Sequence, residues 1–292
     1  MPNFLVLTLT DLYDNISACV DEEFAHLIIE YIASRMHDEV FIRNAGMNLL
    51  LHDRDANVKR RLREFISILK AISDLPKGSY ALIKVRPFIS NIWNDVDLLV
   101  DKEKLTQVIN ILKRWSISKV IYKRGKGLTF YLRNTSLQID LYTHIAWREL
   151  KYLEPGLISE AEITEFPIAD GTKIRVYVLP LFLDLTIQAL HVFASGTLTL
   201  SDMLKLLCFR NVREEEIKQR LKLYVKLDDL LGYLKYVMLV QVDELLKRGY
   251  AKLPVNPVLK LYLIFNNLKH HNFDFRGYYY ELKDIVRKIL VK

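Results

Sequence analysis

Asn94-Asp95-Val96-Asp97-Leu98-Leu99-Val100 is the stretch of sequence that decides the fold. Its apolar, branched residues predict a buried β-strand that begins at Asp95. Successive side chains of a strand point to opposite faces, so Asp95 and Asp97 are expected side by side while the residues between them face a core. Two adjacent carboxylates repel each other, and a hard cation such as Mg²⁺ is the usual reason to keep them together.

A third carboxylate lies downstream, in the apolar segment Leu137-Gln138-Ile139-Asp140-Leu141-Tyr142. This segment is predicted to be another strand of the same sheet. A carboxylate at Asp140 would complete a two-metal site of the kind that supports phosphoryl transfer. An Asp-x-Asp pair is also common at strand edges without a metal. The joint pattern of the pair, a following helix and a single later Asp favours the metal site.

The elements expected around these motifs predict an α+β protein, with a small mixed β-sheet core between two helical regions. Helical spacing of apolar residues covers 18–37 and 56–72, and Leu75-Pro76-Lys77-Gly78-Ser79 then breaks the pattern. In the core we expect strands over 80–85, 95–100, 119–122, 128–132 and 137–142, a helix over 102–115 and a hairpin over 163–179 that turns at Asp170-Gly171. Beyond Pro180 the chain is predicted to be wholly helical, over 181–195, 199–210, 213–248, 255–270 and 275–291.

These elements predict three parts of the chain. Residues 1–76 are expected to form a helical N-terminal region, 77–180 the α+β core, and 181–292 an all-helical C-terminal domain. The 213–248 stretch contains Gly232 near its middle and is compatible with two helices.

Charge along the chain points to a phosphate-rich partner. The chain has 42 Lys and Arg against 35 Asp and Glu, a net charge of +7, and residues 104–139 contain basic residues but no carboxylate. Such a stretch suits a nucleoside triphosphate or a polyanionic acceptor such as RNA, and equally a solvated hairpin. Lys84 and Arg86 are predicted on one strand face, where they would either neutralise phosphate charge or pair with the nearby Asp residues.

Several classes of protein are excluded by absent motifs. No apolar run is long enough to cross a bilayer, and the segment Phe4-Leu5-Val6-Leu7 lacks the basic lead and cleavage site of a signal peptide. Two distant cysteines, Cys19 and Cys208, predict neither a disulfide framework nor a zinc site. We therefore expect a cytoplasmic protein without a membrane partner. Gly125-Lys126-Gly127 is predicted to be a hairpin turn, because no phosphate-binding glycine loop occurs.

The order of strand, Asp-Val-Asp strand, helix and distal strand Asp resembles the nucleotidyltransferase superfamily typified by DNA polymerase beta. The resemblance is closest to its uncharacterised nucleotidyltransferase branch, and it covers roughly residues 80–208. The matching positions are Lys84, Arg86, Asp95, Asp97 and Asp140, followed by Trp147; His191 and Leu200-Ser201-Asp202-Met203-Leu204 match the two helices that follow the core in that branch.

The resemblance implies a magnesium-dependent enzyme that transfers a nucleoside monophosphate from a nucleoside triphosphate to an acceptor hydroxyl. Asp95 and Asp97 would hold two Mg²⁺ ions, and Asp140 would bind the catalytic one. Lys84 and Arg86 would bind phosphate, with Ser90 contributing polar contacts.

Two departures from the family pattern leave an alternative open. The Gly-Ser pair that contacts the triphosphate is absent between Leu82 and Asn94, and Tyr142 stands where family members often carry His. The alternative is a catalytically inactive module of the same fold that binds nucleic acid or a partner protein. The acceptor, the preferred base and the oligomeric state are not predicted.

Overall fold

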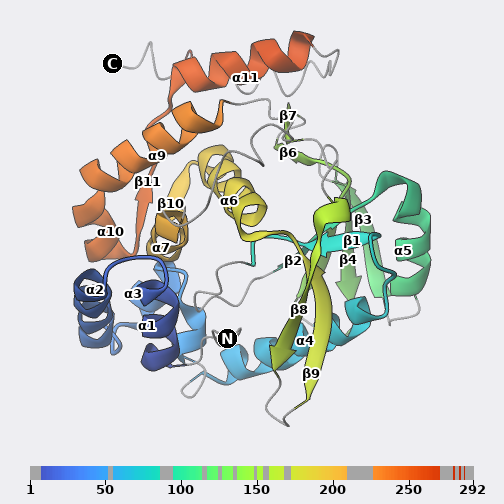
Figure 1. Cartoon of the computed structure of the whole chain (residues 1–292), viewed down its shortest axis with the longest axis horizontal. Helices are drawn as coiled ribbons and strands as arrows, with labels where there is room; N and C mark the ends of the chain where they lie inside the picture. Colours follow the sequence, from blue (N-terminus) through green and yellow to red (C-terminus); the bar gives the residue numbers. More distant parts are fainter. Residues whose placement is uncertain are drawn as a thin grey trace.

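The computed structural model describes residues 8–51, 55–85, 95–113, 117–123, 127–133, 137–147, 150–153, 158–167, 172–208 and 226–269, together with 279, 283 and 286. Within them the chain forms an α+β protein whose centre is a seven-stranded mixed sheet, as predicted. In Figure 1 most of the helices lie to the left of this sheet, one lies below it and one lies on its right-hand side.

The large sheet has the strand order β3-β4-β5-β2-β1-β9-β8. Its strands are β1 (Tyr80–Leu82), β2 (Asp95–Val100), β3 (Ile117–Lys123), β4 (Gly127–Leu132), β5 (Gln138–Tyr142), β8 (Glu162–Pro167) and β9 (Lys173–Val178). The predicted hairpins are confirmed, because β4 pairs antiparallel with β5 and β8 with β9. β3 and β4 also pair antiparallel across residues 124–126, as expected of a hairpin, and Gly127 has a φ of +95°. The proposed turn residues 124–126, 134–136 and Asp170-Gly171 lie outside the described residues.

Because side chains alternate in direction along the central strands, the two faces of the sheet carry different residues. Val96, Leu98 and Val100 point into a core with helices α4 (Ala56–Ser73) and α5 (Leu105–Leu112). Both helices lie in the sequence where apolar spacing predicts them, and a short 3₁₀ turn, η2 (Lys102–Lys104), leads into α5. The opposite face of β2 therefore carries Asp95 and Asp97, turned away from that core.

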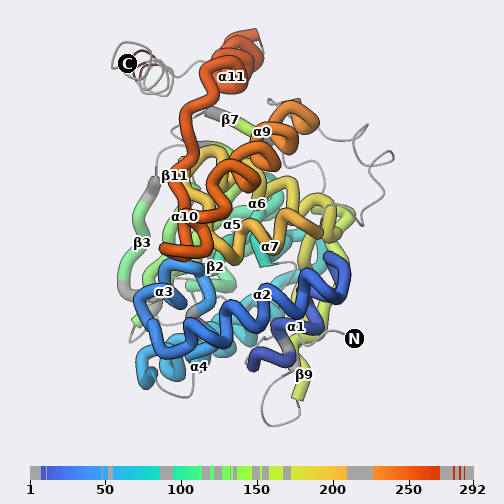
Figure 2. Tube along the Cα trace, turned by 90° about the vertical axis from the view of Figure 1, so that its left-hand side faces the viewer, coloured from blue at the N-terminus to red at the C-terminus, as the bar shows by residue number. Residues whose placement is uncertain are grey.

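The remaining helices share a second core that joins the two ends of the chain. Leu12 and Ile32 pack in one cluster with Leu190 and Leu263. Figures 1 and 2 both show α2 and α3 beside α7 and α10. The helices in this group are α1 (Leu9–Ser17), α2 (Glu22–Ser34), α3 (Glu39–Asn44), α6 (Leu181–Ser195), α7 (Leu200–Leu207), α9 (Leu227–Val240), α10 (Val242–Arg248) and α11 (Pro257–Lys269), with the 3₁₀ turn η1 (Asn48–Leu51).

The expectation that the chain is wholly helical beyond Pro180 is wrong. β10 (Thr197–Thr199) and β11 (Tyr250–Lys252) form a two-stranded antiparallel sheet. Each short strand follows a glycine with positive φ, Gly196 and Gly249, which ends the preceding helix in a left-handed cap. The 213–248 stretch divides at Gln241 and not at Gly232, and residues 209–225 lie outside the described residues.

Two further short strands, β6 (Ile145–Trp147) and β7 (Leu150–Leu153), form a small ribbon beyond β5, and η3 (Ile158–Glu160) follows it. The sequence pattern did not indicate them. In the described ranges, no helix combines the length and apolar character needed to cross a bilayer.

The two cysteines form a disulfide, which corrects the expectation drawn from their separation. Cys19 lies between α1 and α2, and Cys208 caps the end of α7, at a sequence separation of 189. Their Cα atoms are 4.5 Å apart. Sequence spacing carried no sign of this pairing, because the shared core of the two helical regions brings the cysteines together.

Candidate metal centre

The three predicted carboxylates meet on one face of the sheet. β2 and β5 are parallel neighbours, and their register places Asp97 opposite Asp140 and Asp95 opposite Gln138. Each of the three Asp side chains offers an oxygen atom, and these atoms all lie within 4.8 Å of one another. The expectation that Asp95, Asp97 and Asp140 lie together is thus confirmed. We call these three residues the carboxylate cluster.

The carboxylate cluster brings three acidic side chains close together in a largely buried place. Asp97 and Asp140 are only 3% and 5% exposed. Burial, and next the charge of Asp97, raise the pKa of Asp95 to about 6. Asp97 Oδ1 is buried and accepts no hydrogen bond from the described residues. An oxygen in that position fits coordination of a hard cation, for which carboxylate oxygens are the preferred ligands.

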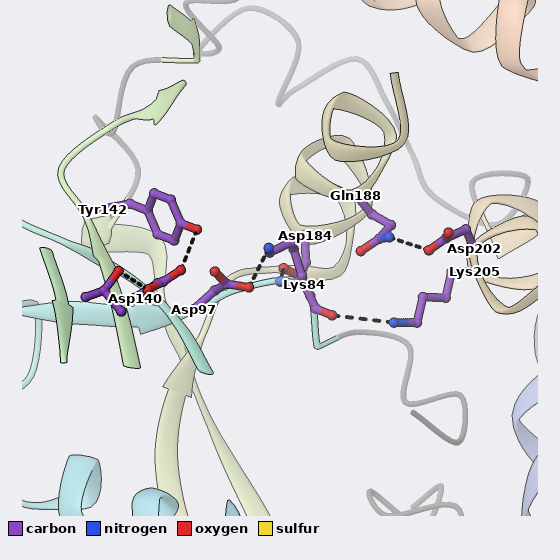
Figure 3. A network of polar contacts seen from close by, with 9 residues as sticks. Lys84, Asp97, Asp140, Tyr142, Asp184, Gln188, Asp202 and Lys205 are labelled. Carbon is purple, nitrogen blue, oxygen red and sulfur yellow. Dashed lines mark hydrogen bonds and ion pairs between the residues drawn. The ribbon is translucent and has the colours of Figure 1, made fainter. Parts of the chain in front are cut away.

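Two side chains that the sequence did not single out as partners contact Asp140, and Figure 3 shows one of them, Tyr142. Thr129 on β4 is buried, and its hydroxyl donates a short hydrogen bond to Asp140 Oδ1. The Tyr142 hydroxyl donates to Asp140 Oδ2 at 3.5 Å. Burial, followed by the charges of Asp97 and Asp140, raises the pKa of Tyr142. Pairing the predicted β4–β5 hairpin in register would have indicated Thr129, because it stands directly opposite Asp140.

Replacing Thr129 by Val is expected to weaken binding of a divalent cation at the cluster by about tenfold, because the hydroxyl orients a ligand carboxylate. Val keeps the shape of the side chain but removes the donor. Titration of Mn²⁺ followed by electron paramagnetic resonance of the free ion measures the change, and Thr129→Ser serves as the matched control. Equal Mn²⁺ affinity in the wild type and the Val variant would show that Thr129 has no orienting role.

Lys84 is a partner of the cluster, but it does not belong to a strand. β1 ends at Leu82, and Lys84 has a φ of +64°, so the prediction of a strand through Val85 is wrong. Among the described residues it is the only non-glycine with positive φ, a conformation that costs about 1–2 kcal/mol. Its ammonium forms an ion pair with Asp97 Oδ2. This ion pair is the interaction that the sequence left open as the alternative to phosphate binding by Lys84.

Electrostatics keep the Lys84 ammonium charged. Burial alone would lower its pKa, but the charges of Asp97 and Asp95 outweigh that effect and leave the pKa above its ordinary value. Arg86 and Ser90, the other predicted phosphate-binding residues, lie outside the described residues.

A cavity of about 240 Å³ opens beside the cluster. Its lining includes the charged residues Lys84, Asp95 and Asp140, together with side chains of β7 and α6 such as Tyr152, Ile187 and Leu190. His191, which the family pattern aligned with a helix after the core, also lines this cavity. The lining thus combines a few charged side chains with many apolar ones, as is common in sites for small organic ligands.

Asp202, the other aligned residue of those helices, is not part of the cluster. It forms a capping box with Thr199 at the start of α7, and its Oδ1 accepts a 2.6 Å hydrogen bond from Gln188. Asp202 therefore caps α7 and links it to α6 through Gln188.

Comparison with known proteins gives no relative: no family model matches the chain, and no curated protein and no solved structure is similar to it.

Proposed function

We propose that this protein is a divalent-metal-dependent nucleotidyltransferase, which transfers a nucleoside monophosphate from a nucleoside triphosphate to an acceptor hydroxyl. The observation that carries the proposal is the carboxylate cluster, with its three oxygens within 4.8 Å and the buried, unpartnered Asp97 Oδ1. Three carboxylates this close, two of them buried and one oxygen without a hydrogen-bond donor, support the binding of a cation.

In this proposal, Asp95, Asp97 and Asp140 hold Mg²⁺, which when bound neutralises the triphosphate and activates the acceptor hydroxyl. The acceptor oxygen bonds to the α-phosphorus as the bond from that phosphorus to the β-phosphate oxygen breaks, so that pyrophosphate leaves. The proton of the acceptor hydroxyl passes to an oxygen of Asp140. The adjoining cavity offers its apolar wall to the uncharged part of a substrate.

The acceptor is proposed to be a polyanion such as RNA. Lys119 and Arg133 are exposed at the β3–β4 side of the sheet, next to β5 with Asp140. Exposed basic residues beside a phosphoryl-transfer centre favour a nucleic-acid acceptor over an apolar one.

A second candidate function is a catalytically inactive module of the same fold that binds nucleic acid or a partner protein. The Lys84–Asp97 ion pair favours it, because an internal ammonium already neutralises one carboxylate of the cluster. A cluster partly neutralised in this way needs less charge from a metal.

The two candidate functions differ in whether a labelled phosphate of the nucleoside triphosphate is transferred to the acceptor. The protein is incubated with Mg²⁺, RNA and each nucleoside triphosphate in turn, labelled at the α- or at the γ-phosphate. We expect the α-label alone to appear on the acceptor, and Asp95→Asn to abolish it. Asp101→Asn is the matched control, because Asp101 follows the same strand and only caps a turn, which Asn also does.

Transfer of the γ-label would indicate a phosphotransferase instead. Binding of RNA without transfer of either label would favour the inactive module.

A further inference from the structure

Two charged side chains from different helices hold the backbone of Lys84. Asp184 of α6 accepts a hydrogen bond from the Lys84 N–H. Lys205 of α7 donates from Nζ to the Lys84 carbonyl oxygen at 3.5 Å. Both backbone polar groups of this residue are thus bound by side chains 100 and 121 residues away in sequence (Figure 3). We call Asp184 and Lys205 the Lys84 clamp.

The clamp consists of deeply buried charges. Asp184 is fully buried, and Lys205 is 2% exposed. Burial lowers the pKa of Lys205, while the charges of Asp202 and Asp184 oppose that effect. Burying charged groups is costly unless they are paired and hydrogen-bonded, so the contacts of two buried charges with the backbone of one residue need an explanation beyond packing.

The clamp acts where the chain leaves the sheet. The Ile83 N–H still donates a hydrogen bond of 3.0 Å to the Asp97 carbonyl oxygen, so the backbone is bonded to β2 at this residue. At Lys84 the backbone turns to a φ of +64°, and the side chain then reaches Asp97 Oδ2. L-residues rarely adopt this conformation unless their surroundings impose it. The bonds to the N–H and to the carbonyl oxygen supply that constraint.

We propose that Asp184 and Lys205 are positioning residues, which hold Lys84 so that its ammonium lies against Asp97 and thereby set the affinity of the carboxylate cluster for a divalent cation. This inference rests on the proposed function, since it concerns the same cluster. The ammonium neutralises a ligand carboxylate and repels an incoming cation. Loosening Lys84 should therefore make cation binding tighter, whereas general damage to the fold would make it weaker.

Mn²⁺ titration of the intact protein, followed by electron paramagnetic resonance of the free ion, tests the proposal. We expect Lys84→Met to bind Mn²⁺ about tenfold more tightly than the wild type. The charge-balanced double variant Asp184→Ala/Lys205→Met should change affinity in the same direction, by about threefold or more. In the Lys84→Met background the double variant should add nothing, because the clamp acts only through Lys84.

Lys104→Met is the matched control, because the Lys104 ammonium also donates to a backbone carbonyl, that of Gly78, 3.1 Å away near the start of β1. It should leave Mn²⁺ affinity unchanged. Thermal unfolding reports whether each variant folds. If the double variant does not fold, Lys205→Met alone makes the test, since it retains Asp184 and its contact with the Lys84 N–H.

The outcomes separate the two proposals. A wild-type protein that binds no Mn²⁺ at the cluster would overturn the proposed function. A wild-type protein that binds Mn²⁺, with clamp variants of equal or weaker affinity, would overturn the clamp alone. Effects of the clamp variants that persist in the Lys84→Met background would also overturn it.

Discussion

Asp97→Asn is expected to lower the rate of nucleotide transfer by about a thousandfold, the scale on which single groups at a charged transition state act. Asp97 lies between its neighbours: it stands opposite Asp140 in the register, shares a strand face with Asp95, and pairs with Lys84. The Asn amide keeps the shape but removes the charge that a cation needs. Initial rates with α-labelled nucleoside triphosphate at saturating Mg²⁺ measure the loss.

The proper comparison is with Asp101→Asn, at the other end of the same strand. Near-ultraviolet circular dichroism should show that both variants keep the native packing. An Asp97→Asn variant that transfers nucleotide within tenfold of the wild-type rate would mean that the cluster does not carry the reaction.

Loss of the disulfide is the change expected to affect stability most. Cys19 and Cys208 close a loop of 189 residues, and disulfides that close long loops stabilise by about 4 kcal/mol, mainly by restricting the unfolded chain. The double variant Cys19→Ala/Cys208→Ala should therefore lower the free energy of unfolding by about that amount. Guanidinium unfolding with and without dithiothreitol measures it.

The reductant provides the internal control. It should destabilise the wild type and leave the double Ala variant unaffected. Identical unfolding midpoints for the oxidised and the reduced wild type would contradict this prediction.

Sequence patterns predicted the helices and strands whose formation depends on residues close together in the sequence. The amphipathic period of 56–72 corresponds to α4, and alternation over 128–142 corresponds to the β4–β5 hairpin. The carboxylate cluster was predictable for the same reason: the Asp pair shares a strand face by alternation, and Asp140 follows an apolar pattern of its own.

Tertiary contacts decide the parts that the sequence patterns did not indicate. Lys84 follows the apolar residues of β1, and the sequence pattern therefore predicts that the strand continues through it. Its conformation depends instead on hydrogen bonds with Asp184 and Lys205, which lie in helices distant in sequence. The disulfide depends likewise on the core shared by the two helical regions. β10 and β11 are three residues each, too short for periodicity to reveal, and they form because they pair with each other.

We propose that Asp95, Asp97 and Asp140 together hold a divalent cation. The most direct test of this proposal is a crystal structure of the wild-type protein grown with Mn²⁺ and a non-hydrolysable nucleoside triphosphate, with anomalous scattering recorded for manganese. We expect an anomalous peak in direct coordination with Asp97 Oδ1 and with an oxygen of each of the other two carboxylates. A cluster without an anomalous peak at saturating Mn²⁺, with the Lys84 ammonium still the sole cation against Asp97, would contradict the claim.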